Sequence, residues 1–175
     1  MTTLPIADAM RRVETVLGRK PEAGKHDDAP ATARWKSGAR FVASHPNGAQ
    51  IATDMPTELG GTGDQVTPGW LFRAGLAACS ATSILMAAAA EGIALTMLEV
   101  NAGSRSDTRG LLGMREADGT LVYGGPGDVS LQVRIAADDV EPARLRAVVQ
   151  AGVARSPVPN VVTNATPLDL RIDIA

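Results

Sequence analysis

The part of the sequence that most constrains the fold is an uncharged stretch, residues 74–90, inside a longer predicted helix. Thr67 can cap this helix, Pro68 suits its first turn, and Gly92 suits its C-terminal end. Apolar residues lie on every face of the helix, and such a helix is normally buried on every face. The uncharged stretch is short for a membrane span and rich in alanine, which favours a buried helix over a transmembrane one. We therefore expect one long helix enclosed by a sheet or by a second protomer.

Residues 1–30 are predicted to form an N-terminal helix followed by a linker. Apolar residues recur at helical spacing and precede a glycine that suits the end of a helix: Ile6, Met10, Val13, Leu17 and then Gly18. Residues 20–30 are polar and contain prolines, which is typical of a linker. The remaining residues, 31–175, are long enough to form one domain with a sizeable core.

Three strands are predicted before the long helix, at residues 31–36, 40–44 and 49–53. Asn47-Gly48 lies between the last two. This pair tolerates positive φ at both central turn positions, so it predicts a two-residue hairpin turn.

After the long helix, residues 94–104 and 129–135 are predicted as strands, and the second of these alternates strictly between apolar and polar. A second helix begins near Pro142 and ends at the proline-containing residues 156–159. Residues 168–174 alternate again and predict a final strand. Strands grouped around two main helices indicate an α+β fold rather than alternating βαβ units.

Composition excludes several classes of function. A net charge of −2 gives no electrostatic reason to expect nucleic acid as a partner. His26 and His45, with a single cysteine, are too sparse for a zinc site, and no cofactor-binding motif is present. One cysteine cannot form an internal disulfide, and the start of the sequence lacks the pattern of a secretory signal, so we expect a cytoplasmic protein.

Cys79, on the long helix, is the one plausible reactive group. A lone cysteine on an apolar helix is usually a small inert core residue. The helix dipole helps little, because Cys79 lies about three turns from Pro68 and the effect fades after the first turn. A reactive thiolate therefore needs a cation nearby.

The sequence resembles the OsmC/Ohr family of osmotically inducible and organic hydroperoxide resistance proteins. The resemblance rests on residues 68–79, with a proline, then Leu-Phe, Ala-Gly and Ala-Ala-Cys, and on Leu59-Gly60-Gly61 upstream. Residues 107–113, Asp-Thr-Arg-Gly-Leu-Leu-Gly, are similar to a subgroup marker. The resemblance covers residues 31–175 and implies antiparallel sheets around a long buried central helix, in an intertwined homodimer. It also implies an antioxidant role in oxidative stress, through reduction of organic hydroperoxides by a thiol peroxidase.

Two positions depart from the family pattern, and the position of the activating arginine is open between two residues. Where the family has a second cysteine, this sequence has Ser156, or Arg155 if the register slips. Where the family has a glutamate that holds an activating arginine, ten positions before the reactive cysteine, it has Gly69. The arginine itself comes from the first hairpin in the family, so Arg40 is the nearest candidate and Lys36 competes.

These observations lead to a one-cysteine peroxidase as the main hypothesis. Cys79 would react with the hydroperoxide, Arg40 would stabilise the thiolate, and an external thiol would act as reductant. The alternative is a non-catalytic protein that binds a small apolar ligand on the same scaffold. A hot-dog-type thioesterase is a weaker rival, for which Asp64 is the one acid near the helix start.

Overall fold

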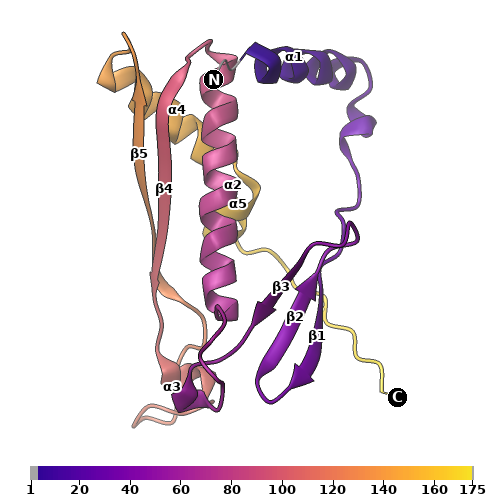
Figure 1. The fold of residues 1–175 in the computed structure, drawn as a ribbon, viewed down its shortest axis with the longest axis vertical. Coiled ribbons are helices and arrows are strands. Elements are labelled where there is room, and N and C mark those ends of the chain that lie inside the picture. Colours follow the sequence, from indigo (N-terminus) through magenta and orange to yellow (C-terminus); the bar gives the residue numbers. More distant parts are fainter. Residues whose placement is uncertain (1–3, 175) are drawn as a thin grey trace. The chain divides into compact units, whose positions relative to one another are not determined.

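The structure, a computed structural model, describes residues 4–174. The chain divides into two compact units, one formed by Asp8–Gly75 and the other by residues up to Ala7 together with residues from Leu76 onward. In chain order the elements are α1 Leu4–Arg19, η1 Pro21–Gly24, β1 Thr32–Ser37, β2 Arg40–Ser44, β3 Gln50–Thr53, η2 Thr57–Leu59, α2 Pro68–Ala90, β4 Leu95–Arg105, α3 Thr108–Leu111, β5 Gly127–Ala137, α4 Pro142–Ala154 and α5 Pro157–Thr163. Helices combined with antiparallel sheets confirm the predicted α+β class (Figure 1).

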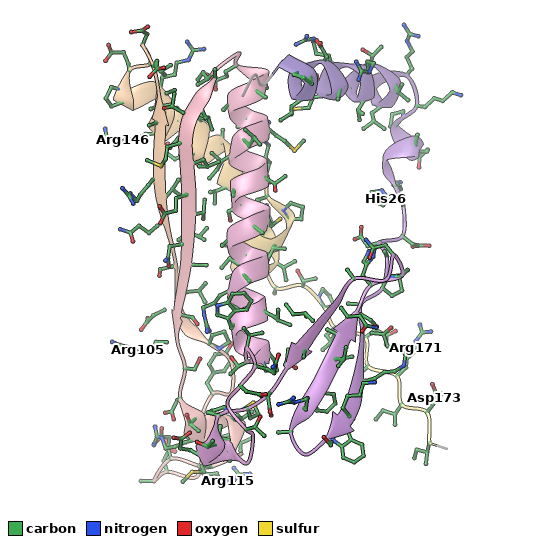
Figure 2. All side chains as sticks on the ribbon, in the orientation of Figure 1. His26, Arg105, Arg115, Arg146, Arg171 and Asp173 are labelled. Atoms are coloured by element: carbon green, nitrogen blue, oxygen red, sulfur yellow. The ribbon has the colours of Figure 1, made fainter. Side chains whose placement is uncertain are left out.

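The Asp8–Gly75 unit contains an antiparallel sheet in the order β1-β2-β3. The predicted N-terminal helix is confirmed as α1, although it continues through Gly18 to Arg19. The linker after α1 carries His26, and it contains the short helix η1 (Figure 2). The predicted division of the chain at residue 30 stays a prediction.

The hairpin between β2 and β3 is confirmed, but its predicted turn is wrong. The backbone N–H of Gly48 donates to the carbonyl of His45 at 3.0 Å, so Pro46 and Asn47 occupy the two central positions. Gly48 has a φ of 93°, while Asn47 is not among the described residues with positive φ. Proline fixes φ near −65° and suits the first central position of a type I turn, so glycine takes the left-handed position after the turn.

The long helix is confirmed as α2, with both of its expected ends. The N–H of Trp70 donates to Thr67 Oγ1 at 3.2 Å, which caps the first turn. At the other end Gly92 has a φ of 70°, and the N–H of Ile93 reaches back to the carbonyl of Ala88 at 2.9 Å. This pattern is the Schellman motif, in which a left-handed glycine lets the chain close over the last carbonyls.

Burial of α2 on every face is not reached within the single chain. Leu76, Ile84 and a run of alanines are buried, but Phe72 and Met86 are 36% and 38% exposed. Among the described residues α2 is the one helix long and apolar enough to cross a membrane, a test that the core helix of a soluble protein also passes. Enclosure of the remaining faces by a second protomer stays a prediction.

The unit that begins at Leu76 builds its core where α2 and α4 meet a two-stranded sheet. β4 and β5 pair antiparallel, with Leu98 opposite Ile135 and Val100 opposite Val133. These half-buried side chains pack on a buried cluster from the two helices and the turn after α2: Ile84, Ala87, Ala88, Ile93, Leu145 and Val148. The two strands predicted at residues 94–104 and 129–135 are therefore confirmed.

A short helix, α5, follows α4 and was not predicted. The prolines at residues 157 and 159 were interpreted only as the end of the preceding helix. Pro157 does end α4, yet it also starts α5 as its first residue. Proline suits the first turn of a helix, because the N–H that it lacks has no intrahelical partner there.

The final strand predicted at residues 168–174 is not formed in the single chain, which has no regular secondary structure there. The segment keeps its alternation, with Arg171 and Asp173 between apolar residues (Figure 2). Its apolar side chains are strongly exposed, Leu168 at 91% and Ile174 at 94%. A strand needs a neighbouring strand to satisfy its backbone, and the described residues of this chain do not supply one.

Candidate functional site

Cys79 lies in the middle of α2, half-buried, and its sulfur contacts the side chain of Ser156. The Ser156 hydroxyl donates a hydrogen bond to Cys79 Sγ at 3.2 Å. Ser156 is completely buried. The structure thus brings together the predicted reactive residue and a serine that is predicted to stand where the family has its second cysteine, although 77 positions separate them in sequence.

Close packing of α4 on α2 explains why Ser156 reaches the sulfur. Leu145, Val148 and Gly152 recur at helical spacing and are the buried residues of α4. A Cβ atom added to Gly152 would lie 2.6 Å from Ile84 Cα, so only glycine lets the two backbones come this close. Ser156 follows one turn after Gly152, two residues after the last residue of α4. Arg155 is exposed, whereas Ser156 is buried against Cys79, so Ser156 is the one of these two neighbouring residues whose side chain contacts the sulfur.

Arg40 lies in the other unit, where it forms a polar cluster with Asp54, Thr62 and Asp64. Arg40 Nη2 donates to Asp54 Oδ2 at 3.2 Å, to Thr62 Oγ1 at 2.7 Å and to an oxygen of Asp64. The hydrogen bond that Arg40 donates to Asp64, and then the one that it donates to Asp54, raise the pKa of Arg40, so the guanidinium stays charged. Arg40, Asp54 and Thr62 line a cavity of about 290 Å³ that also includes Ser37 and Gly61.

Asp54 is the deepest member of this cluster, and no motif in the sequence points to it. Its side chain is only 2% exposed. The Thr62 hydroxyl, 2.7 Å from Asp54 Oδ2, lowers the pKa of Asp54 to about 2, and the backbone N–H groups of Thr62 and Met55 and the Arg40 guanidinium act in the same direction. An acid directly after a strand is common in loops, so no sequence signal marked its burial.

The loop around Asp54 requires glycine at residues 60 and 61. Gly60 has a φ of 80°, which favours glycine. A Cβ atom on Gly61 would overlap the carbonyl group of Met55 and lie 2.8 Å from Asp54 Oδ1. The loop can therefore wrap around the Asp54 carboxylate only if residue 61 has no side chain.

Of the remaining predicted site residues, Lys36 and Gly69 lie outside this cluster, whereas Asp64 belongs to it. Lys36 is exposed on β1. Gly69 lies in the first turn of α2, where an added Cβ would be 3.7 Å from Arg73 Nη1. Asp64 is 2.6 Å from Thr62 Oγ1, and hydrogen bonds from Thr62 and then Arg40 lower its pKa. Asp64 is thus hydrogen-bonded to Thr62 and paired with Arg40. These contacts weaken the thioesterase hypothesis, which needs Asp64 as its catalytic acid.

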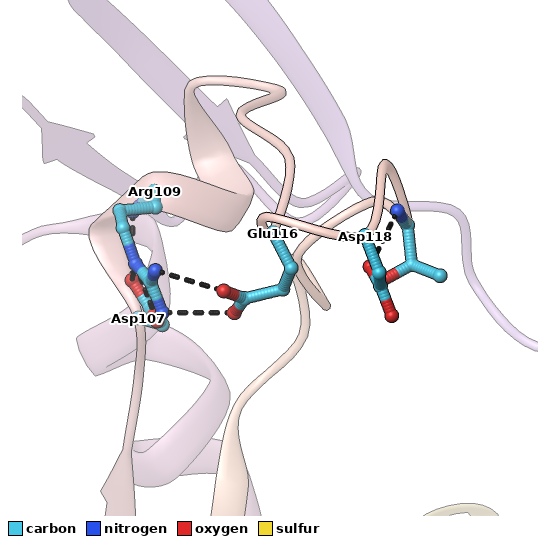
Figure 3. A network of polar contacts seen from close by, with 5 residues as sticks. Asp107, Arg109, Glu116 and Asp118 are labelled. Atoms are coloured by element: carbon cyan, nitrogen blue, oxygen red, sulfur yellow. Dashed lines mark hydrogen bonds and ion pairs between the residues drawn. The ribbon is translucent and has the colours of Figure 1, made fainter.

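The Asp-Thr-Arg-Gly motif at residues 107–110 forms a separate structural network. Asp107 caps α3 by accepting from the N–H of Arg109 at 2.9 Å. The Arg109 guanidinium binds both Asp107, at 2.6 Å, and Glu116, at 3.1 Å (Figure 3). Its hydrogen bonds lower the pKa of Asp107. These contacts join the start of α3 to the loop after it, so the motif is explained by loop geometry.

No candidate metal centre is found among residues 4–174. The described residues contain no group of three or more His, Cys, Asp or Glu side chains that could hold a metal ion.

The fold and the cysteine site define a class of α+β protein with a thiol on its longest helix. Residues 61–171 match the family described as OsmC-like protein. This match covers more than half of the sequence, and the chain belongs to the OsmC-like family. The family predicted from the sequence is therefore confirmed.

Solved structures agree with this fold. An OsmC-like protein from Mycoplasma pneumoniae is 20% identical with a TM-score of 0.66, and the match covers 81% of this chain and 91% of that one. An organic hydroperoxide resistance protein from Elizabethkingia anophelis, with thiocyanate from the crystallisation solution bound, is 20% identical with a TM-score of 0.61 and the same coverages. The organic hydroperoxide resistance protein OhrB of Bacillus subtilis is 19% identical with a TM-score of 0.51, covering 79% of this chain and 93% of OhrB. No curated protein sequence matches the chain.

Proposed function

We propose that this protein is a one-cysteine thiol peroxidase that reduces organic hydroperoxides through Cys79, with an external thiol as reductant. The observation that carries the proposal is the contact between Cys79 and Ser156. The side chain that contacts the sulfur carries a hydroxyl and not a second thiol, so the catalytic cycle has to be completed by a thiol from outside. The names of the similar structures, organic hydroperoxide resistance proteins, support this substrate class.

The proposed reaction has two stages. The Cys79 thiolate attacks the terminal oxygen of the hydroperoxide, the O–O bond breaks, and the alkoxide takes up a proton and leaves as an alcohol. Sulfur is oxidised by two electrons to a sulfenic acid. One external thiol then displaces water and forms a mixed disulfide, and a second thiol releases Cys79 as the external disulfide forms. The sum is one hydroperoxide and two thiols converted into one alcohol, one water and one disulfide.

We propose Arg40 as the cation that stabilises the thiolate in the assembled protein. Three acceptors hold its Nη2 atom, and within residues 4–174 neither Nη1 nor Nε has a hydrogen-bond acceptor. A guanidinium held on one side keeps its direction and has donors left for an anion. Arg40→Gln is expected to slow peroxide reduction at least tenfold, whereas Lys36→Gln, a charge loss on the neighbouring strand, is expected to leave it within twofold. A larger loss of peroxide reduction in Lys36→Gln than in Arg40→Gln would indicate that Lys36, and not Arg40, stabilises the thiolate.

A homodimer is part of this proposal. One chain leaves Phe72 and Met86 of α2 exposed, and its C-terminal segment presents an alternating apolar row from Leu168 to Ile174 that pairs with no strand among residues 4–174. Burying both sets against a second copy would supply the missing neighbours. Native mass spectrometry at low micromolar concentration is expected to show a dimer, and a monomer under these conditions would contradict this part of the proposal. We also propose a cytoplasmic location and no nucleic-acid partner.

The experiment that tests the function follows the loss of cumene hydroperoxide in the presence of a dithiol, for the wild-type protein and Cys79→Ser. The expected result is turnover in the wild-type protein and background in the variant. Equal background loss in both would remove the peroxidase. A non-catalytic protein that binds small apolar ligands would then be favoured, because both Gly69 and Ser156 depart from the pattern of the working enzymes.

A further inference from the structure

The Ser156 side chain does not cap the helix that it precedes. Ser156 is the N-cap residue of α5, and a serine there usually accepts a hydrogen bond from a backbone N–H of the first turn. The Ser156 side chain makes no such cap bond. Its hydroxyl donates to Cys79 Sγ instead, and within the described residues this is the one hydrogen bond of that hydroxyl.

The surroundings make this hydrogen bond strong and directed. Ser156 is completely buried, so no water competes for the hydroxyl proton. Its backbone is fixed by its own N–H, which donates to the carbonyl of Val153 at 3.1 Å, and by Asn160, whose side-chain amide donates to the Ser156 carbonyl at 2.9 Å. A hydrogen bond to an ionised acceptor is worth more than one to a neutral acceptor. The same bond therefore favours a thiolate over a thiol.

We propose that Ser156 is a catalytic hydrogen-bond donor to Cys79, which activates the sulfur as a nucleophile. This inference rests on the proposed function and adds a residue to it. The hydroxyl keeps its proton throughout, donating to the thiolate before attack and to the oxidised sulfur or its oxygen afterwards. Because serine cannot form a disulfide with the sulfenic acid, the oxidised state persists until an external thiol arrives.

Alkylation of Cys79 by iodoacetamide tests the role of Ser156 without requiring peroxide chemistry. We expect Ser156→Ala to slow alkylation at pH 7 about tenfold, the size of effect given by losing a hydrogen bond to a charged group. The pH profile of the rate is expected to move to higher pH, which a merely structural loss would not produce. Ser156→Thr keeps the hydroxyl and is expected to restore most of the rate.

Ser80→Ala is the matched control. Ser80 is also completely buried and follows Cys79 on α2, but its hydroxyl donates to the carbonyl of Leu76 at 2.7 Å. This variant removes a buried hydroxyl next in sequence to the cysteine, and its alkylation profile is expected to match that of the wild-type protein.

Two outcomes would overturn the proposal. One is an unchanged alkylation profile in Ser156→Ala, with native circular dichroism. The other is an equal displacement in Ser156→Ala and Ser80→Ala, which would indicate a general loss of packing. If the profile moves as expected but wild-type protein does not consume cumene hydroperoxide, Ser156 activates Cys79 and the peroxidase proposal alone fails.

Discussion

Replacing Ser156 with cysteine is expected to create a disulfide with Cys79. The donor and acceptor atoms are already 3.2 Å apart, and the side chains come from adjoining helix segments held by the contact between Gly152 and Ile84. A disulfide has an S–S distance of about 2.05 Å, and a C–S bond is longer than a C–O bond, so roughly 1 Å of adjustment closes the bridge. Side-chain rotation can supply a movement of this size without separating α4 from α2.

The gain in stability follows from the length of the loop that the bridge would close. The two residues are 77 positions apart. For a loop of this length, the lost entropy of the unfolded chain corresponds to about 4.5 kcal/mol at 25 °C, and measured gains are typically about 2–4 kcal/mol. We therefore expect the oxidised variant to be about 2–4 kcal/mol more stable than its reduced form.

Intact mass spectrometry without reductant shows whether the disulfide forms. Urea unfolding before and after reduction measures the gain in stability. Arg155→Cys is the matched control, because residue 155 is exposed and should not bridge to Cys79. A variant at residue 156 that keeps two free thiols under mild oxidation would refute the described packing of α4 on α2. So would a bridge formed equally well from residue 155.

Three further predictions concern the supports of the site. Gly61→Ala is expected to destabilise the protein by about 1–3 kcal/mol, because its Cβ overlaps the Met55 carbonyl. Gly18→Ala is the control: no atom lies within 4 Å of the added Cβ, so this variant should be neutral or stabilising in thermal melts. Thr67→Ala removes the cap of α2 and should cost about 1 kcal/mol in urea unfolding, and no change would show that the cap is dispensable. The pKa of Asp54 is lower in the folded protein, about 2 against 3.8, so its contribution is complete above about pH 4 and is lost as the pH falls towards 2. Urea midpoints across this range should fall less in Asp54→Asn than in the wild-type protein, and parallel curves would contradict the assignment.

Local patterns in the sequence predicted most of the helices and strands. Thr67 and Gly92 bracket α2 because capping is decided within one turn of the helix. The turn at residues 46–48 was misassigned, because Asn-Gly indicates one turn type and the preceding proline imposes another. Proline has two roles at Pro157 as well, where it follows the end of one helix and begins the next, and the sequence pattern indicates only the first of these roles.

The contacts that build the site could not be predicted from local patterns. The burial of Asp54 depends on a loop eight residues later, and the Cys79–Ser156 contact depends on how α4 crosses α2. The family pattern points to Ser156 or Arg155 as the position of a second cysteine, yet nothing in the neighbouring sequence indicates that the Ser156 hydroxyl donates to the sulfur and not to the helix cap. At the C-terminal segment the local pattern predicts too much, because its alternation indicates a strand for which residues 4–174 supply no neighbouring strand.

The most direct test of the central claim is mass spectrometry of Cys79 after one equivalent of cumene hydroperoxide, with dimedone present to trap sulfenic acid. A redox-active Cys79 predicts a dimedone adduct on the peptide that contains residue 79, and its disappearance when a dithiol is added before the trap. A peptide that remains an unmodified thiol while the hydroperoxide persists would contradict the claim.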